Sequence, residues 1–307
     1  MDLRKFEYLK TIAEEKTLSQ AAQKLYVSQP SLSQFLSKTE QTLGTKLFKR
    51  INQELIPTKA GTIYINTAYE LLALHKNALL QLQELSQNHH GELSIGMTPE
   101  RSVNSLHSIY VPFHRKYPNV RLHFFEEFPS QLVEMTQRGQ LDFAIISDYT
   151  KRAGFEYIPL CSNVMVLFIN KDNPIIADIK YPTDGTIPYI DMERLKNCEF
   201  MGSKINTQSR RIYDNVFTET SYYPQVVFET NSAQTSLNMV SVSNVIALMP
   251  SAYAFPNQTQ LRHFRVPRNP TWNICAACKQ GKYLGSITND LISIIKKHLN
   301  ETIMIKT

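Results

Sequence analysis

Apolar residues between Leu3 and Leu43 recur at helical spacing and predict three short helices in succession. The first stripe repeats every three residues, which is typical of one face of an α-helix, and consists of Leu3, Phe6, Leu9 and Ile12. The second would follow a capping Thr17 and consists of Leu18, Ala21, Ala22 and Leu25. Because alanine is small, the pair at positions 21 and 22 lets a neighbouring helix cross closely.

A third helix is predicted between residues that favour helix ends. Ser28 can cap its start, Pro30 fits its first turn and Gly44 can stop it. Its apolar residues Leu32, Phe35 and Leu36 would face the protein core. Its short polar residues would face solvent, and these are Gln29, Ser31, Ser33 and Gln34. With a turn around Tyr26 and Val27, the second and third helices have a helix-turn-helix layout, which inserts its second helix into the major groove of DNA. A merely solvated polar face is the alternative, but the ordered run of cap, turn, cap and stop favours DNA recognition.

The residue types on this outward face suit the chemistry of a duplex. Short polar side chains exchange hydrogen bonds with base edges, and a proline ring can contact a thymine methyl group. We therefore expect base contacts from Gln29, Pro30, Ser33 and Gln34. We expect phosphate contacts from Ser31, Lys38, Lys49 and Arg50.

Two short extended segments after Gly44, on either side of a turn at Asn52-Gln53, would form a wing. Lys49 and Arg50 belong to the first of them. The first 60 residues carry ten lysines and arginines against six acidic residues. Such a basic excess attracts the phosphate backbone and supplies affinity that does not depend on sequence.

A long helix is predicted from Thr58 to about Gln87, because this stretch lacks proline and its apolar residues follow a heptad-like spacing. We expect this seam to pair with a second copy of the chain, and it consists of Leu71, Leu74, Ala78, Leu82 and Leu85. Packing on its own domain is the alternative. Residues 88–91 are polar and end in glycine, which predicts a hinge. We interpret the adjacent histidines at 89 and 90 as loop residues, because no further metal ligand is close in sequence.

Strands alternate with helices after Gly91. We expect strands at 92–96, 120–125 and 141–146 and helices at 103–117 and 130–138. This βαβαβ order predicts an α/β architecture with a parallel sheet, whose ligand sites lie at the carboxyl ends of the strands.

Composition limits the class of protein. The chain has 307 residues, of which 42% are hydrophobic and 20% charged, with a formal net charge of +6, as in a folded globular protein. We find neither a long apolar run nor a signal peptide, and the four cysteines are unevenly spaced. We therefore expect a cytoplasmic protein without a membrane partner.

The N-terminal pattern resembles the DNA-binding domain of the LysR-type transcriptional regulators. The residues that carry the resemblance are Ala21, Ala22, Leu25, Ser28, Gln29, Pro30, Leu32, Ser33, Glu40, Leu43, Gly44, Leu47, Phe48 and Arg50. Further landmarks extend it over nearly the whole chain, among them 57–61, 113–120, 139–145 and 246–250. The chain departs from the family pattern at Thr39, Glu54, Pro57, Ser243 and Val245. The acid at position 54 stands in a wing that is often rich in arginine.

This resemblance implies a sequence-specific bacterial transcription factor with three parts. Residues 1–58 would form a winged helix-turn-helix, 59–90 a linker and dimerisation helix with its hinge, and 91–307 an effector-binding domain. That domain would hold two Rossmann-like subdomains similar to periplasmic binding proteins, one of 91–161 and 267–307, the other of 162–266. The family implies homodimers that pair into tetramers, and a change in subdomain closure that alters the grip on DNA.

The effector is expected between the subdomains, at strand ends and helix starts. By position these would be Thr98, Glu100, Arg101, Ser130, Gln131, Ser147, Gly202, Thr207, Gln208, Ser209 and Asn231. Hydroxyl groups and free N–H groups at helix starts suit a carboxylate or an amino acid, with Arg101 as a partner for the acid and Glu100 for an amine. The alternative is that these serines, threonines and asparagines are ordinary helix caps.

Other chemistries receive little support from the sequence. Cys275 and Cys278 have redox-motif spacing, but they lie in a strand-like run where residues three apart face opposite sides, so we expect packing. Cys198 lies near the region where peroxide-sensing family members carry a reactive thiol, without a matched resolving cysteine. No catalytic or cofactor-binding motif is recognisable, so we expect no enzymatic activity and no cofactor. A transport-type solute-binding protein is the alternative from another class, and the N-terminal domain opposes it.

Overall fold

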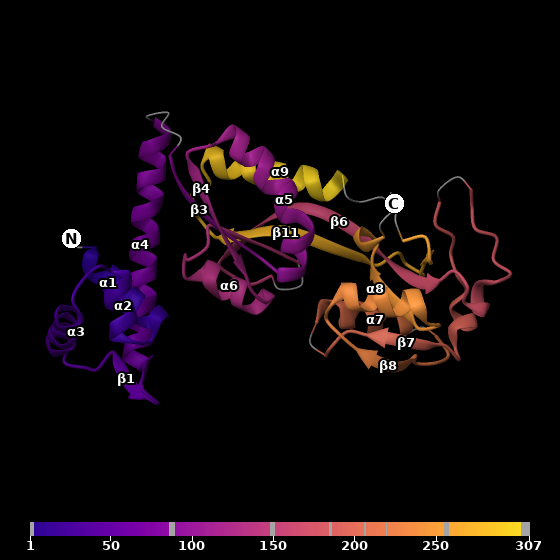
Figure 1. The fold of residues 1–307 in the computed structure, drawn as a ribbon, viewed down its shortest axis with the longest axis horizontal. Coiled ribbons are helices and arrows are strands. Elements are labelled where there is room, and N and C mark those ends of the chain that lie inside the picture. Colours follow the sequence, from indigo (N-terminus) through magenta and orange to yellow (C-terminus); the bar gives the residue numbers. More distant parts are fainter. Residues whose placement is uncertain are drawn as a thin grey trace.

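The computed structural model describes residues 3–85, 90–147, 151–183, 186–205, 207–218, 220–254 and 258–301, without the side chains of 83–85. Along the longest axis of the molecule, a small helical domain comes first, a long helix stands beside it, and an α/β domain of two halves follows (Figure 1). The predicted hinge residues 88 and 89 lie outside the described residues.

The N-terminal domain is a winged helix-turn-helix. It contains α1 (Arg4–Glu15), α2 (Leu18–Lys24), α3 (Gln29–Leu43), β1 (Phe48–Ile51) and β2 (Glu54–Pro57). The predicted ends are confirmed: the side chains of Thr17 and Ser28 cap α2 and α3, and Gly44 ends α3 with a left-handed φ of 66°. Ala21 and Ala22 are buried in the common core of the three helices.

The wing is an antiparallel pair of strands joined by a two-residue turn. β1 pairs with β2, and Asn52 and Gln53 between them have φ angles of 47° and 68°. Two successive positive φ angles are typical of a hairpin turn whose twist matches that of its strands. The predicted wing is therefore confirmed.

The long helix α4 (Lys59–Leu85) begins directly against the wing. Thr58 accepts a hydrogen bond from the backbone N–H of Gly61 through its hydroxyl oxygen, at 3.0 Å. A Cβ atom on Gly61 would lie 1.8 Å from the carbonyl oxygen of Leu47. Only glycine lets α4 approach the wing this closely.

In the described part of the α/β domain, eight strands follow one another in a continuous sheet, and a ninth strand pairs with β6. The first half of the domain holds β3 (Gly91–Met97), α5 (Pro99–Lys116), β4 (Val120–Glu126), α6 (Pro129–Gln137), β5 (Phe143–Ser147), β11 (Thr271–Lys279) and α9 (Ser286–Glu301). The second holds η2 (Pro174–Ile176), η3 (Met192–Leu195), β7 (Glu199–Gly202), α7 (Gln208–Phe217), β8 (Gln225–Glu229), α8 (Ala233–Val242), β9 (Ile246–Pro250), η4 (Ser251–Tyr253) and β10 (Leu261–Arg265). The strand β6 (Phe155–Asn170) runs through both halves.

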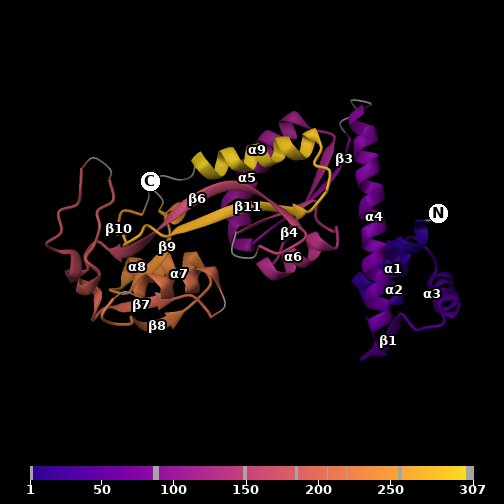
Figure 2. The ribbon, with the colours of Figure 1, turned by 180° about the vertical axis from the view of Figure 1, so that it is seen from behind.

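Each half is a mixed sheet with helices on both faces. The predicted parallel pairing holds for the outer strands, whereas β11 pairs antiparallel with β5 and β6, and β6 pairs antiparallel with β9 and β10. The strand order is β4-β3-β5-β11-β6-β9-β7-β8, with parallel pairs around β3 and around β7. Helices α5 and α9 cover one face of the first half and α6 the other, while α7 and α8 cover the two faces of the second. Strands β6 and β11 extend from one half toward the other in both views (Figures 1 and 2). The limit predicted between residues 161 and 162 falls inside β6, and the limits of the subdomains stay a prediction.

Two helices of the first half begin earlier than expected. The helix predicted from Val103 begins at Pro99, and the helix predicted from Ser130 begins at Pro129. Proline fits the first helical position because its missing N–H has no partner there. Glu100 and Arg101 therefore lie in the first turn of α5, ahead of the start that was predicted for this helix. Ser147, which directly follows the strand predicted at 141–146, is the last residue of β5.

Candidate DNA-binding surface and effector site

The residues of α3 that were predicted to contact DNA share one exposed face. Exposed side chains follow the helix at Gln29, Pro30, Ser31, Ser33, Gln34 and Lys38. On the opposite face Leu32 and Leu36 are buried. In both ribbon views α3 lies at the end of the molecule that is remote from the α/β domain (Figures 1 and 2). The face is therefore accessible to a large partner.

The wing adds two cations beside this helix. Lys49 and Arg50 are exposed in β1, as a phosphate contact requires. The acidic Glu54 of the same wing lies with a carboxylate oxygen 3.5 Å from the Nζ atom of Lys16. The positive charge of Lys16 therefore offsets part of the negative charge that Glu54 brings to the wing, where it would oppose contacts with DNA phosphates.

A buried glutamate fixes the wing to the end of α3. Glu40, only 6% exposed, accepts hydrogen bonds from the backbone N–H groups of Leu47 and Phe48 at 2.9 and 3.2 Å and from Lys46 at 2.6 Å. Burial by itself raises the pKa of Glu40, but these three donors outweigh it and hold the pKa below its ordinary value. The charged carboxylate thus sets the position of the wing relative to α3.

Tyr26 is a candidate contact that the sequence reasoning left unassigned. It is 96% exposed in the turn between α2 and α3 and has a left-handed φ of 54°. This conformation is uncommon for a bulky residue and directs the ring into solvent beside the start of α3. A large aromatic residue in a turn that precedes a recognition helix was the signal available in the sequence.

A carboxylate from one half of the α/β domain occupies a helix start in the other half. The Oε1 atom of Glu100, in α5, accepts hydrogen bonds from the backbone N–H groups of Ala233 and Gln234 at 2.5 and 3.2 Å. These are the first two residues of α8, whose cap Ser232 satisfies the N–H of Thr235. A helix start carries partial positive charge and unpaired N–H groups, so it is suited to an anion.

Tyr253 and Arg101 lie close to this contact. Tyr253, in η4, hydrogen-bonds to Glu100, and burial together with that carboxylate raises the pKa of Tyr253 to about 12. The positive charge of Arg101 acts to lower the pKa of both Tyr253 and Cys161, against the larger effect of burial. The Cys161 sulfur accepts a hydrogen bond from the side-chain amide of Asn163 at 3.7 Å. Tyr253 was not predicted, although it follows the carboxyl end of β9, where the fold class places ligand sites.

Some of the remaining predicted effector residues form hydrogen bonds with nearby backbone groups, and the others lie at the ends of strands or helices. The Thr207 hydroxyl caps α7 by accepting a hydrogen bond from the backbone N–H of Arg210, and it donates to the carbonyl oxygen of Lys204. The backbone N–H of Lys204 donates to the side-chain oxygen of Asn231. Thr207 therefore fits the capping alternative, whereas Asn231 binds the backbone before α7 and caps neither α7 nor α8. The others lie before α5 (Thr98), in the first turn of α6 (Ser130, Gln131), at the end of β5 (Ser147), at the end of β7 (Gly202) and in the first turn of α7 (Gln208, Ser209).

Neither a metal site nor a membrane span is visible in the described ranges. No group of histidine, cysteine and acidic side chains among these residues could hold a metal ion. No helix among them is both long enough and apolar enough to cross a bilayer. His89 of the histidine pair lies outside the described residues.

Comparison with known families decides the identity of these two parts. Residues 3–62 match the family described as "Bacterial regulatory helix-turn-helix protein, lysR family", and residues 86–300 match "LysR substrate binding domain". The chain belongs to the LysR family of transcriptional regulators. It is a DNA-binding regulator whose α/β domain is the effector-binding domain of that family.

LysR regulators of several bacteria are similar to the chain over most of its length. An uncharacterized HTH-type transcriptional regulator YcgK of Bacillus subtilis is 23% identical, with 98% of this chain and 96% of that protein covered. A hydrogen peroxide-inducible genes activator of Dickeya chrysanthemi is 27% identical, with 82% and 79% covered. These relatives are transcriptional regulators.

Solved structures of LysR regulators share the fold. A full-length variant of OxyR from Pseudomonas aeruginosa has a TM-score of 0.72 and 20% identity, with 98% of this chain and 95% of that chain covered. Full-length CbnR in complex with its target DNA has a TM-score of 0.59 and 16% identity, with 98% and 100% covered. At these identities the likeness shows the fold alone.

The cysteines of this LysR chain have the character of packed residues. All four lie within the described ranges and none of them forms a disulfide bond, and Cys275 and Cys278 belong to the cores on opposite faces of the sheet. Burial raises the pKa of Cys198, which favours the unreactive thiol.

Proposed function

We propose that this LysR regulator recognises DNA with α3 and its wing and responds to a small carboxylate or amino acid bound between the two halves of its α/β domain. On α3, Gln29, Pro30, Ser33 and Gln34 contact bases, and Ser31 and Lys38 contact phosphates. Lys49 and Arg50 in the wing contact phosphates. The exposure of all eight side chains supports this assignment.

The observation that carries the effector proposal is the Glu100 carboxylate on the N-terminus of α8. Two backbone N–H groups there already bind a carboxylate that comes from the opposite half of the domain. An effector carboxylate has the same geometry and takes this place when the two halves separate. The neighbouring Arg101 then supplies a cation for the effector, and the released Glu100 is a partner for an amine.

The assembly is a homodimer that can pair further into a tetramer. Leu74 and Leu82 of the predicted seam are 67% and 61% exposed within one chain, and Ala78 is also exposed. A leucine row on a long helix is stable in water when a second copy covers it. Leu71 is half-buried, and the side chain of Leu85 lies outside the described part.

The first experiment removes the internal carboxylate and offers an external one. In Glu100→Ala the N–H groups of α8 lose their acceptor, so added acetate binds there and stabilises the folded chain. We expect sodium acetate to raise the melting temperature of Glu100→Ala more than sodium chloride does at the same ionic strength. The unaltered chain should respond less, because Glu100 competes with acetate.

The matched control is Glu126→Ala, which removes an exposed glutamate at the end of β4. This variant should respond to acetate as the unaltered chain does. An equal acetate response in all three proteins would contradict a carboxylate site at α8. A panel of amino acids and small carboxylates in the same assay then identifies the effector class.

A further inference from the structure

The α/β domain touches the helix-turn-helix of its own chain through the short segment 139–142, which joins α6 to β5. Gly139 has a φ of 74°, and a Cβ atom built on it would lie 2.8 Å from the Cβ of Ala73 in α4. Both ribbon views place α4 beside the half of the domain that carries β3 and α6 (Figures 1 and 2). The backbone of this segment therefore packs directly on the long helix.

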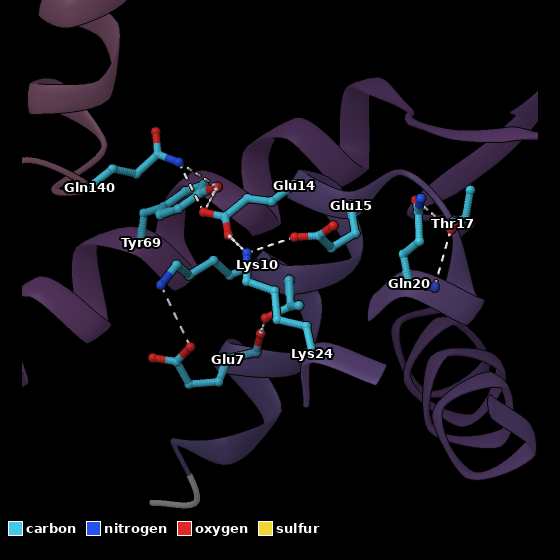
Figure 3. A network of polar contacts seen from close by, with 10 residues as sticks. Glu7, Lys10, Glu14, Glu15, Thr17, Gln20, Lys24, Tyr69 and Gln140 are labelled. Atoms are coloured by element: carbon cyan, nitrogen blue, oxygen red, sulfur yellow. Dashed lines mark hydrogen bonds and ion pairs between the residues drawn. The ribbon is translucent and has the colours of Figure 1, made fainter. Parts of the chain in front are cut away.

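The next residue reaches past α4 to the DNA-binding domain. The side-chain N–H of Gln140 donates to the Glu14 carboxylate of α1 at 2.9 Å and to the Tyr69 oxygen of α4 at 3.4 Å. The Tyr69 hydroxyl donates to the same Glu14 oxygen at 3.1 Å, so three elements meet at one carboxylate (Figure 3). Burial and the Glu14 charge raise the pKa of Tyr69 well above its ordinary value, which keeps the hydroxyl a donor.

Charged groups extend the same contact along α4. Asp142, 2% exposed, binds Lys76 of α4 at 2.8 Å and Lys282 at 2.7 Å and also accepts from the N–H of Ser94. Lys279 of β11 lies 3.6 Å from Glu70 of α4. The contact is thus a surface of several polar groups rather than a single hydrogen bond.

The contact continues from Glu14 into the helix-turn-helix. Lys24, the last residue of α2, lies 3.8 Å from Glu14 and 2.6 Å from Glu15 (Figure 3). The hydrogen bond that Lys24 donates to Glu15 is the main reason that the pKa of Lys24 is raised. Because α2 packs on α3, a displacement of segment 139–142 can be transmitted through α1 and α2 to the recognition helix.

The docked face of α4 is opposite to its leucine seam. The residues that contact the α/β domain are Tyr69, Glu70, Ala73 and Lys76. At about 100° per residue, Ala78 lies about 140–180° around the helix from Tyr69, Ala73 and Lys76. Glu70 lies at the edge of the docked face, about 40° from Leu74. One helix can therefore bind the α/β domain of its own chain and a second copy at the same time.

We propose that Gln140 and Glu14 are positioning residues: segment 139–142 docks the α/β domain on the helix-turn-helix and fixes the direction of α3 relative to the second copy. This inference rests on the proposed dimer but is independent of the effector site. A fixed direction matters only when two recognition helices must reach two half-sites at a set spacing. It does not affect how one α3 contacts one half-site.

The test compares two DNA probes with the full-length protein. One is a duplex that covers the whole footprint in the protein's own upstream region, and the other covers half of that footprint. Gln140→Ala should bind the whole footprint about tenfold more weakly, which corresponds to the loss of a hydrogen bond to a charged group. Its affinity for the half footprint should equal that of the unaltered chain.

Gln137→Ala is the matched control, because Gln137 is exposed at the end of α6, three residues from Gln140. It should bind both probes normally. An equal loss on both probes, or no loss on either, would overturn the proposal. If the unaltered chain bound both probes equally, the dimer would not place two recognition helices on two half-sites. The present proposal, which rests on that dimer, would then be wrong as well.

A double-variant cycle checks that Gln140 and Glu14 act through one contact. Glu14→Ala should reproduce the selective loss on the whole footprint, and Gln140→Ala should add little to it. Melting temperatures of all variants identify any that fold poorly. Fully additive losses in the well-folded variants would contradict the contact between the two residues.

Discussion

Individual side chains on α3 and in the wing divide into two kinds of contact. Short polar groups such as Ser33 can read bases but carry no charge, whereas Arg50 carries a charge but lies outside the helix. Base contacts set sequence preference, and phosphate contacts set overall affinity. The sequence predicted the exposed face of α3 because exposure on a helix face follows from periodicity alone, and the contacts themselves stay a prediction. It placed the start of α5 at Val103 rather than Pro99, because the proline was not recognised as a helix start.

Two substitutions separate these roles. Ser33→Ala should reduce the discrimination between the preferred site and unrelated DNA by about 1–3 kcal/mol, because a base-edge hydrogen bond is lost. Arg50→Ala should weaken binding to all sequences alike and reduce the salt dependence by about one unit of slope. Binding titrations at several salt concentrations measure both quantities. An unchanged sequence preference in the first, or an unchanged slope in the second, would refute the assigned role.

Among the secondary-structure elements, the long helix α4 has two faces with different partners, and its N-terminus packs against the wing. Gly61 lets it meet the wing, one face contacts the α/β domain, and the opposite face presents leucines to solvent. The heptad-like spacing predicted the leucine face. It did not predict the docked face, because Tyr69 and Lys76 become partners only through residues far along the chain.

The seam can be tested with two leucines that receive the same change. Leu74→Asp places a charge in the proposed interface and should convert dimers into monomers, because an unpaired charge buried between apolar side chains is costly. Leu79 is 45% exposed and lies about 140° around the helix from Leu74, outside the seam. Leu79→Asp should leave the dimer intact. Sedimentation or light scattering that gave the same mass for both variants would contradict the seam.

Across the whole molecule, the buried Asp142 joins the α/β domain to α4. Burial alone would raise the pKa of Asp142, but the charges and hydrogen bonds of Lys282 and Lys76 outweigh it and lower the pKa. For Lys282 burial dominates and lowers its pKa as well. A carboxylate with a depressed pKa stabilises the fold above its unfolded pKa of about 4, and this contribution is lost as the pH falls through the folded value.

The consequence is a specific pH dependence of stability. Asp142→Asn leaves two lysines without their anion and should cost about 3 kcal/mol at pH 7. Below about pH 4 the unaltered chain progressively loses the same contribution, so the two melting temperatures should converge. Denaturation at pH 7 and at pH 3 measures the difference. A gap that stayed constant or widened on acidification would show that the ion pairs do not stabilise the fold.

The sequence by itself determined what depends on neighbours along the chain. The caps Thr17 and Ser28, the stop at Gly44, the wing turn and the leucine seam follow from local backbone preferences and periodicity. Only the tertiary structure decided which groups meet across long separations. Glu100 reaches α8 from 133 residues away, and Gln140 reaches Glu14 from 126. Such contacts depend on how packed elements orient one another, and no local pattern records that orientation.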